Sequence, residues 1–143
     1  MAINGYNHVA GYSTLNAVNP NSELVHAFLH DGRSMIDLGS LGNPGTDTDV
    51  SVALGLNKLD RVVGYSYLPA GPGMPQQVAF LWRRGTAVSG EMINLNTLLS
   101  ATDRHYVLIS ATAINDNGQI VANAYDTLNG GGPRAVLLTP VGP

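Results

Sequence analysis

An internal repeat that runs through the whole chain constrains the fold more than any other feature. An apolar residue followed by Asn occurs at Asn4, Asn57 and Asn115, and a small residue lies inside an apolar block seven positions after each Asn. Up to four blocks recur in fixed order: residues 9–13, 62–66 and 120–124; residues 27–29, 79–81 and 135–137; and, in the first two copies, residues 35–41 and 92–98. The chain therefore holds about two and a half units of one repeat.

The blocks have the composition of β-strands. Each is short, β-branched or alternating, and bounded by turn residues. Residues 115–118 (NDNG) predict a tight turn between the first two strands of a unit, because Asn and Gly accept a positive φ. Longer connections rich in Pro, Gly and Asn cover residues 16–23 and 69–77, and Asp31-Gly32 and Arg84-Gly85 mark the last hairpins. Each unit is therefore expected to be a four-stranded antiparallel meander.

These units predict an all-β fold in one domain over residues 1–143. The expected units are residues 1–52, 53–110 and an incomplete 111–143, and their size suits the blades of a β-propeller-like assembly. A β-trefoil or another β-repeat assembly is the alternative. The only helical feature expected is a turn near residues 95–101.

Small sheets cannot bury their faces alone, so the units are expected to stack on one another. Recurring small residues indicate close approach between adjacent sheets; they are Gly11, Gly64, Ala27, Ala79 and Ala135. The residues expected in the core are Val9, Phe28, Leu29, Ile36, Leu38, Val62, Val63, Phe80, Leu81, Ile93, Leu95, Ile114, Val121, Val136 and Leu137.

Composition narrows the function classes. Only 12% of residues are charged and 44% are hydrophobic, which favours a packed domain over disorder. A net charge of −3 argues against nucleic-acid binding, and no apolar run is long enough to insert into a membrane. The absence of Cys excludes disulfides, thiolate zinc sites and Cys nucleophiles.

Several blocks resemble the HAF repeat family of predicted extracellular bacterial proteins. The His-Ala-Phe block that names the family matches residues 26–28, the M-x-D-L-G-T-L-G pattern is similar to residues 35–42, and the A-I-N-D-x-G-Q pattern to residues 113–119. The resemblance implies an array of β units and an extracellular or cell-surface location, although this chain shows no signal peptide. Val78 and Arg134 replace the His in the later units, which argues against catalysis by that His.

Two groups of side chains are candidate ligand sites. The candidate metal ligands are His26 and His30, which lie on one face of a predicted strand with Asp31 or Asp37 nearby, and, separately, Asp47 and Asp49 of an oxygen-rich loop whose carboxylates suit Ca²⁺. No cofactor is expected otherwise; Ca²⁺ at this loop is the alternative. Tyr12, Tyr65, Trp82 and Tyr125 are candidate ligand-binding aromatics, with packing inside or between sheets as the competing interpretation.

No catalytic residues are predicted. The chain has no G-x-S-x-G elbow, and Ser13 and Ser66 occupy equivalent repeat positions, which favours a structural role. We therefore expect a non-enzymatic extracellular β-repeat module with a structural or binding role, in a homo-oligomer or a longer repeat array. The alternatives are a glycan-binding, lectin-like propeller and a small secreted hydrolase without a recognisable motif.

Overall fold

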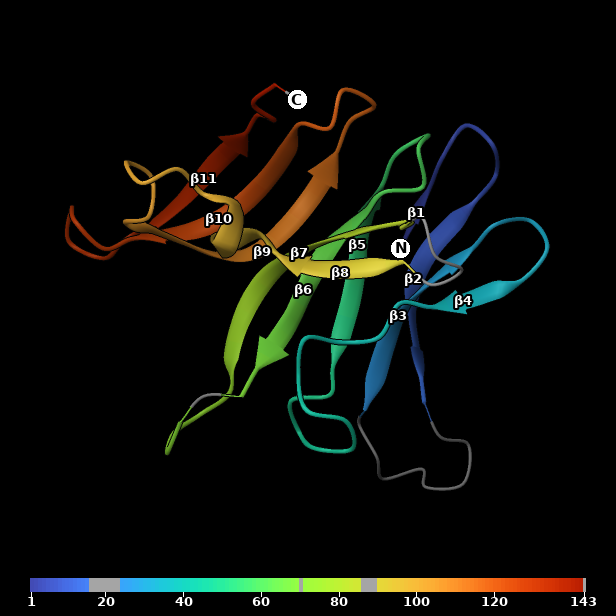
Figure 1. Ribbon diagram of the computed structural model, residues 1–143, viewed down its shortest axis with the longest axis horizontal. Coiled ribbons are helices and arrows are strands. Elements are labelled where there is room, and N and C mark those ends of the chain that lie inside the picture. Colours follow the sequence, from blue (N-terminus) through green and yellow to red (C-terminus); the bar gives the residue numbers. More distant parts are fainter. Residues whose placement is uncertain (16–23, 70, 86–89, 143) are drawn as a thin grey trace.

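The computed structural model describes residues 1–15, 24–69, 71–85 and 90–142, which form three antiparallel sheets in chain order (Figure 1). The predicted connection at 16–23 lies outside the described residues. The first sheet contains β1 (Ala2–Ile3), β2 (Val9–Thr14), β3 (Val25–His30) and β4 (Met35–Asp37). The second contains β5 (Ser51–Leu56), β6 (Val62–Leu68), β7 (Gln76–Arg83) and β8 (Glu91–Asn94), and the third β9 (Tyr106–Ile114), β10 (Ile120–Asp126) and β11 (Pro133–Leu138).

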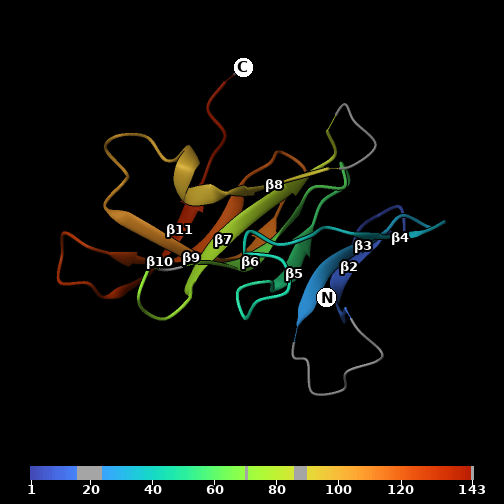
Figure 2. The same ribbon diagram turned by 60° about the horizontal axis from the view of Figure 1, so that its bottom comes forward.

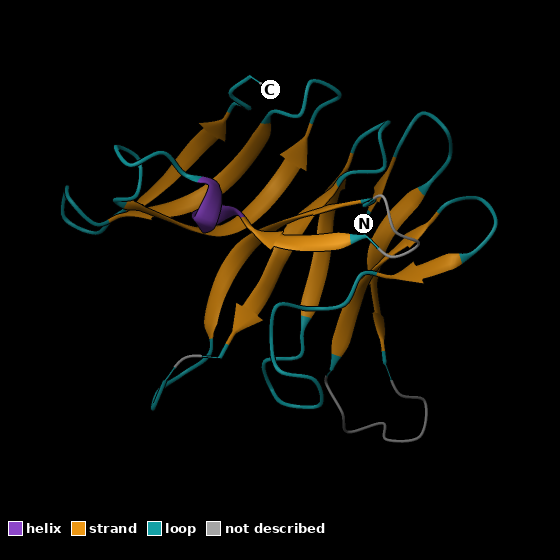
Figure 3. Ribbon diagram, viewed as in Figure 1, coloured by secondary structure: helices purple, strands orange, loops and turns teal. Residues whose placement is uncertain are grey.

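The all-β prediction is confirmed. Each sheet is a meander in which every strand pairs with the next, and the described strands do not close into a barrel, as a β-trefoil would require. The only described helix is the 3-10 helix η1 (Leu95–Leu98), inside the predicted turn (Figure 3). β5 and β9 begin earlier than the unit boundaries at residues 53 and 111, because their first residues already pair with the end of the following strand.

The first hairpin of every unit has the same local chemistry. In the second unit the side-chain Oδ1 of Asn57 accepts the backbone N–H groups of Leu59 and Arg61, both at 3.0 Å. The third residue after each repeat Asn has a positive φ: it is 62° at Asn7, 56° at Asp60 and 79° at Gly118. Asn, Asp and Gly tolerate this conformation best, so the sequence pattern fixes the turn.

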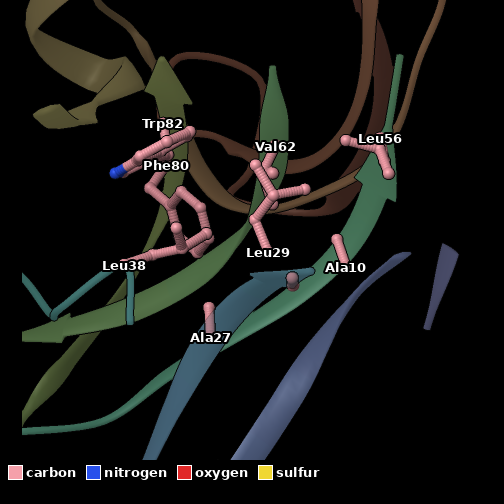
Figure 4. Close-up of a cluster of buried hydrophobic side chains, with 9 residues drawn as sticks. Ala10, Ala27, Leu29, Leu38, Leu56, Val62, Phe80 and Trp82 are labelled. Atoms are coloured by element: carbon pink, nitrogen blue, oxygen red, sulfur yellow. The ribbon is translucent and has the colours of Figure 1, made fainter. Parts of the chain in front are cut away.

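The sheets stack face to face in chain order (Figure 2). At the first interface Leu29 of β3 packs with Phe80 and Trp82 of β7, as Figure 4 shows. The second sheet is therefore covered on both faces: Val62 belongs to the core shared with the first sheet and Val63 to the core shared with the third. This arrangement confirms that the units bury their apolar residues against one another.

Two residues of the expected core are exposed. Val121 is 43% exposed and Leu137 is 62% exposed, although Val63 at the equivalent position of the second unit is fully buried. Both lie on the face of the third sheet that no other described sheet covers. Six of the expected core residues are buried, namely Leu29, Leu38, Val62, Val63, Phe80 and Leu95.

The interpretation of the repeated glycines needs a correction. A Cβ at Gly64 would clash with the backbone carbonyl of Val52 and come within 3.0 Å of the Phe80 ring, and one at Gly11 would lie 3.1 Å from the Phe28 ring. The crowding therefore comes from neighbouring strands of the same sheet rather than from the adjacent sheet. Each aromatic ring covers the glycine directly opposite it, Gly11 facing Phe28 and Gly64 facing Phe80.

Candidate functional site

The joints between successive sheets are built on the repeated Asn residues. Nδ2 of Asn4 donates to the backbone carbonyl of Asn57 at 3.0 Å, and Nδ2 of Asn57 donates to the carbonyl of Asn115, also at 3.0 Å. In Asn4 and Asn57 the amide oxygen accepts hydrogen bonds within its own hairpin, and the amide nitrogen donates to the next hairpin. The same side chain thus shapes one turn and links it to the following unit.

Buried hydroxyl groups add further links at the first interface. Ser51 Oγ accepts the N–H of Ala27 at 2.8 Å and donates to the carbonyl of Gly39 at 2.5 Å. Ser66 Oγ accepts the N–H of Leu41 at 3.0 Å. Both serines are fully buried, so Ser66 has a structural role at the interface between sheets.

The second interface uses an amide in place of these hydroxyls. Asn96 lies at the end of the second unit, in η1, and its side chain pairs with both backbone groups of Leu108 on β9. Its Oδ1 accepts the Leu108 N–H at 2.7 Å and its Nδ2 donates to the Leu108 carbonyl at 2.9 Å. Both interfaces therefore combine an apolar core with hydrogen bonds to backbone groups, which fixes how one sheet sits on the next.

The series of joints ends at the third sheet. Asn115 is exposed, and its Nδ2 donates to Oε1 of Gln119 in its own hairpin at 2.8 Å. The outward face of this sheet, which we call the trailing face, presents Val121, Tyr125 (46% exposed) and Leu137. The Asn115 amide and the side chains of Val121 and Leu137 are thus exposed, whereas the equivalent Asn57, Val63 and Leu81 of the second unit contact the third sheet.

The first sheet has a complementary exposed face, which we call the leading face. Ile3 is 66% exposed and Met35 is 59% exposed. Phe28 is half-buried, whereas its equivalent in the second unit, Phe80, is fully buried. This face is equivalent to the face of the second sheet that packs on the first.

His26 is held between two carboxylates. Its Nδ1 lies 2.8 Å from Oδ1 of Asp37 and its Nε2 lies 2.8 Å from Oδ1 of Asp49. Asp49 is itself buried, and it accepts the Ser40 hydroxyl at 2.6 Å and the Gly45 N–H at 2.8 Å. The cluster joins β3 to the loop that leads into the second sheet.

The electrostatics of the cluster favour an imidazolium. Burial lowers the pKa of His26, but the hydrogen bonds and charges of Asp49 and Asp37 outweigh it, and the net pKa is raised. Burial raises the pKa of Asp49, yet the hydrogen bonds from Ser40, Gly45 and His26 bring the net pKa below its usual range. With both ring nitrogens hydrogen-bonded to carboxylates, His26 has no free lone pair to act as a base or to bind a metal.

The candidate metal ligands do not converge. His30 lies at the opposite end of β3 from His26, where its Nδ1 accepts the N–H of Gly32, and Asp47 is exposed. Among the predicted ligands, the structure joins His26 by hydrogen bonds to Asp37 and to Asp49 of the separately predicted loop. No group of three or more His, Cys, Asp or Glu side chains among the described residues is arranged to hold a metal ion.

The candidate aromatic residues separate into buried and exposed members. Trp82 is 2% exposed in the first core, so its prediction as a surface ligand-binding residue is wrong. Tyr12 is 53% exposed, and Tyr65 is half-buried with its ring 6.2 Å from that of Tyr67. Burial, followed by the neighbouring Tyr67 and Tyr12, raises the pKa of Tyr65. Glycan binding by the exposed tyrosines stays a prediction.

The sequence pattern predicts the repeated Asn residues only as turn residues, and their hydrogen bonds between units were not predicted. The sequence contained a signal for this second role: Asn recurs at one position of hairpins whose other residues vary, although other residues could also form the turn.

No family model, curated protein or solved structure matches the chain. Within the described residues, no helix is both long and apolar enough to cross a membrane.

Proposed function

We propose that this chain is a non-enzymatic β-repeat module, with a propeller-like arrangement, that works by stacking on further units of the same kind. The observation that supports this most is the Asn joint, which recurs with the same atoms and the same 3.0 Å distance at both internal interfaces. A joint used twice within the chain can be used again at the chain's two exposed faces.

The end faces have the composition that such stacking needs. The trailing face presents Val121 and Leu137, whose equivalents in the second unit, Val63 and Leu81, belong to the second core. The leading face presents Phe28, whose equivalent, Phe80, is fully buried. The two faces differ, so contact between copies is head-to-tail, and it forms either a closed ring or an open filament.

The resemblance to the HAF repeat family remains part of this proposal, and with it an extracellular or cell-surface setting. A hydrolase is less well supported. Ser40 donates its hydroxyl to Asp49 and not to His26, so the one Ser, His and Asp cluster described above lacks the order that activates a serine.

Light scattering coupled to size-exclusion chromatography tests association between copies. The wild-type chain is expected to exceed 15.0 kDa in a concentration-dependent manner. Leu137→Glu, which puts a charge on the trailing face, is expected to give a monomer with an unchanged circular dichroism spectrum. Arg134→Glu, a charge change on the same strand, is the matched control and should still associate. A monomeric wild type at every concentration would refute stacking between copies.

A further inference from the structure

A mostly apolar groove of about 810 Å³ lies between the second and third sheets. Its walls are formed mainly by Leu81, Leu95, Leu98, Tyr106, Val136 and Leu138. The groove belongs to the second interface between sheets, so the first interface shows what occupies the same position in a repeat that has all four strands.

Large side chains fill this position at the first interface. Phe80 and Trp82 of β7 are buried there, and Met92 of β8 packs against the same core. In the third unit the residues equivalent to Phe80 and Trp82 are Val136 and Leu138, which are smaller. No described strand follows β11 in the third sheet. The groove is therefore the space left where two aromatic rings and a fourth strand are missing.

The outer edge of β11 is unpaired within the described residues, because β11 bonds to β10 alone. In the second sheet the fourth strand, β8, pairs with β7 so that Met92 lies opposite Trp82 and Ile93 lies opposite Leu81. In the first sheet Met35 pairs opposite His30 and Ile36 opposite Leu29. By the same register, a strand added to β11 would place a Met opposite Leu138, on the groove side, and an Ile opposite Leu137.

We propose that the free edge of β11 and the adjoining groove bind an extended segment from outside residues 1–143, with a sequence of the Met-Ile-Asn-Leu or Met-Ile-Asp-Leu type, by strand addition. Within residues 1–143, the two segments of that type already close the first and second sheets, so the occupant is a segment outside these residues. The inference rests on the proposed function, since it names the segment that completes the third unit of the stacking module.

A synthetic peptide with the sequence of residues 90–98 is the probe, titrated into the full chain by calorimetry and followed at the β11 amides by NMR. Saturable binding is expected, with shifts confined to β11 and the groove. Two further peptides carry N-methyl groups on alternate backbone nitrogens. Strand addition predicts that one of them binds at least about tenfold more weakly, because two backbone hydrogen bonds are lost, whereas the other keeps its affinity within about threefold.

Variants of β11 locate the site. Leu138→Glu, on the groove side, is expected to weaken binding by more than about tenfold, whereas Val121→Glu, on the trailing face of β10 and outside the groove lining, retains it. Because Val121→Glu, like Leu137→Glu, puts a charge on the trailing face, it is also expected to prevent stacking, so peptide binding and association are tested separately. Should Leu138→Glu fail to fold, the N-methylated pair decides with the wild-type chain. No saturable binding, or equal affinity of the two N-methylated peptides, would overturn the proposal.

Discussion

Replacing Asn57 by Ala tests whether the Asn joints hold the stack together. Asn57 is 2% exposed and makes three hydrogen bonds: its Oδ1 accepts from Leu59 and Arg61, and its Nδ2 donates to the carbonyl of Asn115. Each such bond contributes about 1 kcal/mol net, so Asn57→Ala is expected to lower the free energy of unfolding by about 3 kcal/mol.

Asn115→Ala is the matched control for that substitution. Asn115 forms the same hairpin bonds, to the N–H groups of Asn117 and Gln119, but it is exposed and its Nδ2 contacts only its own hairpin. Water replaces these bonds readily, so a loss of about 1 kcal/mol is expected. The difference between the two variants, about 2 kcal/mol, combines about 1 kcal/mol from the hydrogen bond of the joint with the larger cost of losing hairpin bonds that the next unit shields from water.

Urea denaturation is the assay, with the fluorescence of Trp82 and circular dichroism as two probes. Trp82 is the only Trp and is buried at the first interface, so its emission reports on that interface. For a slope near 2 kcal/mol per molar urea, the midpoint of Asn57→Ala should fall by about 1.5 M. Equal losses for Asn57→Ala and Asn115→Ala would show that the side chains serve the hairpins alone and would refute the joint.

Two further predictions concern packing and charge. Gly64→Ala is expected to lower the free energy of unfolding by about 2 kcal/mol or more, because the new Cβ would clash with the Val52 carbonyl and the Phe80 ring. Gly71→Ala is the control and should leave the free energy of unfolding nearly unchanged, because the space around Gly71 is open. Thermal melts of both variants test this prediction. The pKa of His26 is raised on folding, so its contribution to stability is complete below about pH 6.5 and is lost as the pH rises through the folded-state pKa. The urea midpoint of the wild type should therefore fall towards that of His26→Gln between pH 6 and 9, and a difference that stays constant over this range would contradict the charged pairing with Asp49.

Local chemistry made the strands and their hairpins predictable. A positive φ suits Asn7, Asp60 and Gly118, and each repeat Asn satisfies the N–H groups of its own turn. These interactions span five residues or fewer, so both partners of each hydrogen bond lie within the same short segment of the sequence.

The candidate sites were predicted less well because their geometry depends on residues far apart in the chain. Spacing predicted a site of His26 and His30 with Asp31 or Asp37. His26 does contact Asp37, but its second partner is Asp49, from the loop that was predicted as a separate Ca²⁺ site. Trp82 was grouped with the tyrosines because it is aromatic and lies on a predicted strand, but the first sheet covers it. The sequence of a strand does not indicate which sheet packs on each of its faces.

By itself, the sequence determined the repeat, the antiparallel meanders and the turns, because hydrogen bonds and φ preferences within a hairpin are local. Only the tertiary structure decided which face of each sheet is buried. Val63 and Val121 occupy the same repeat position, but Val63 is fully buried against a following sheet and Val121 is 43% exposed. Burial depends on what packs against a face, and no pattern within one unit contains that information.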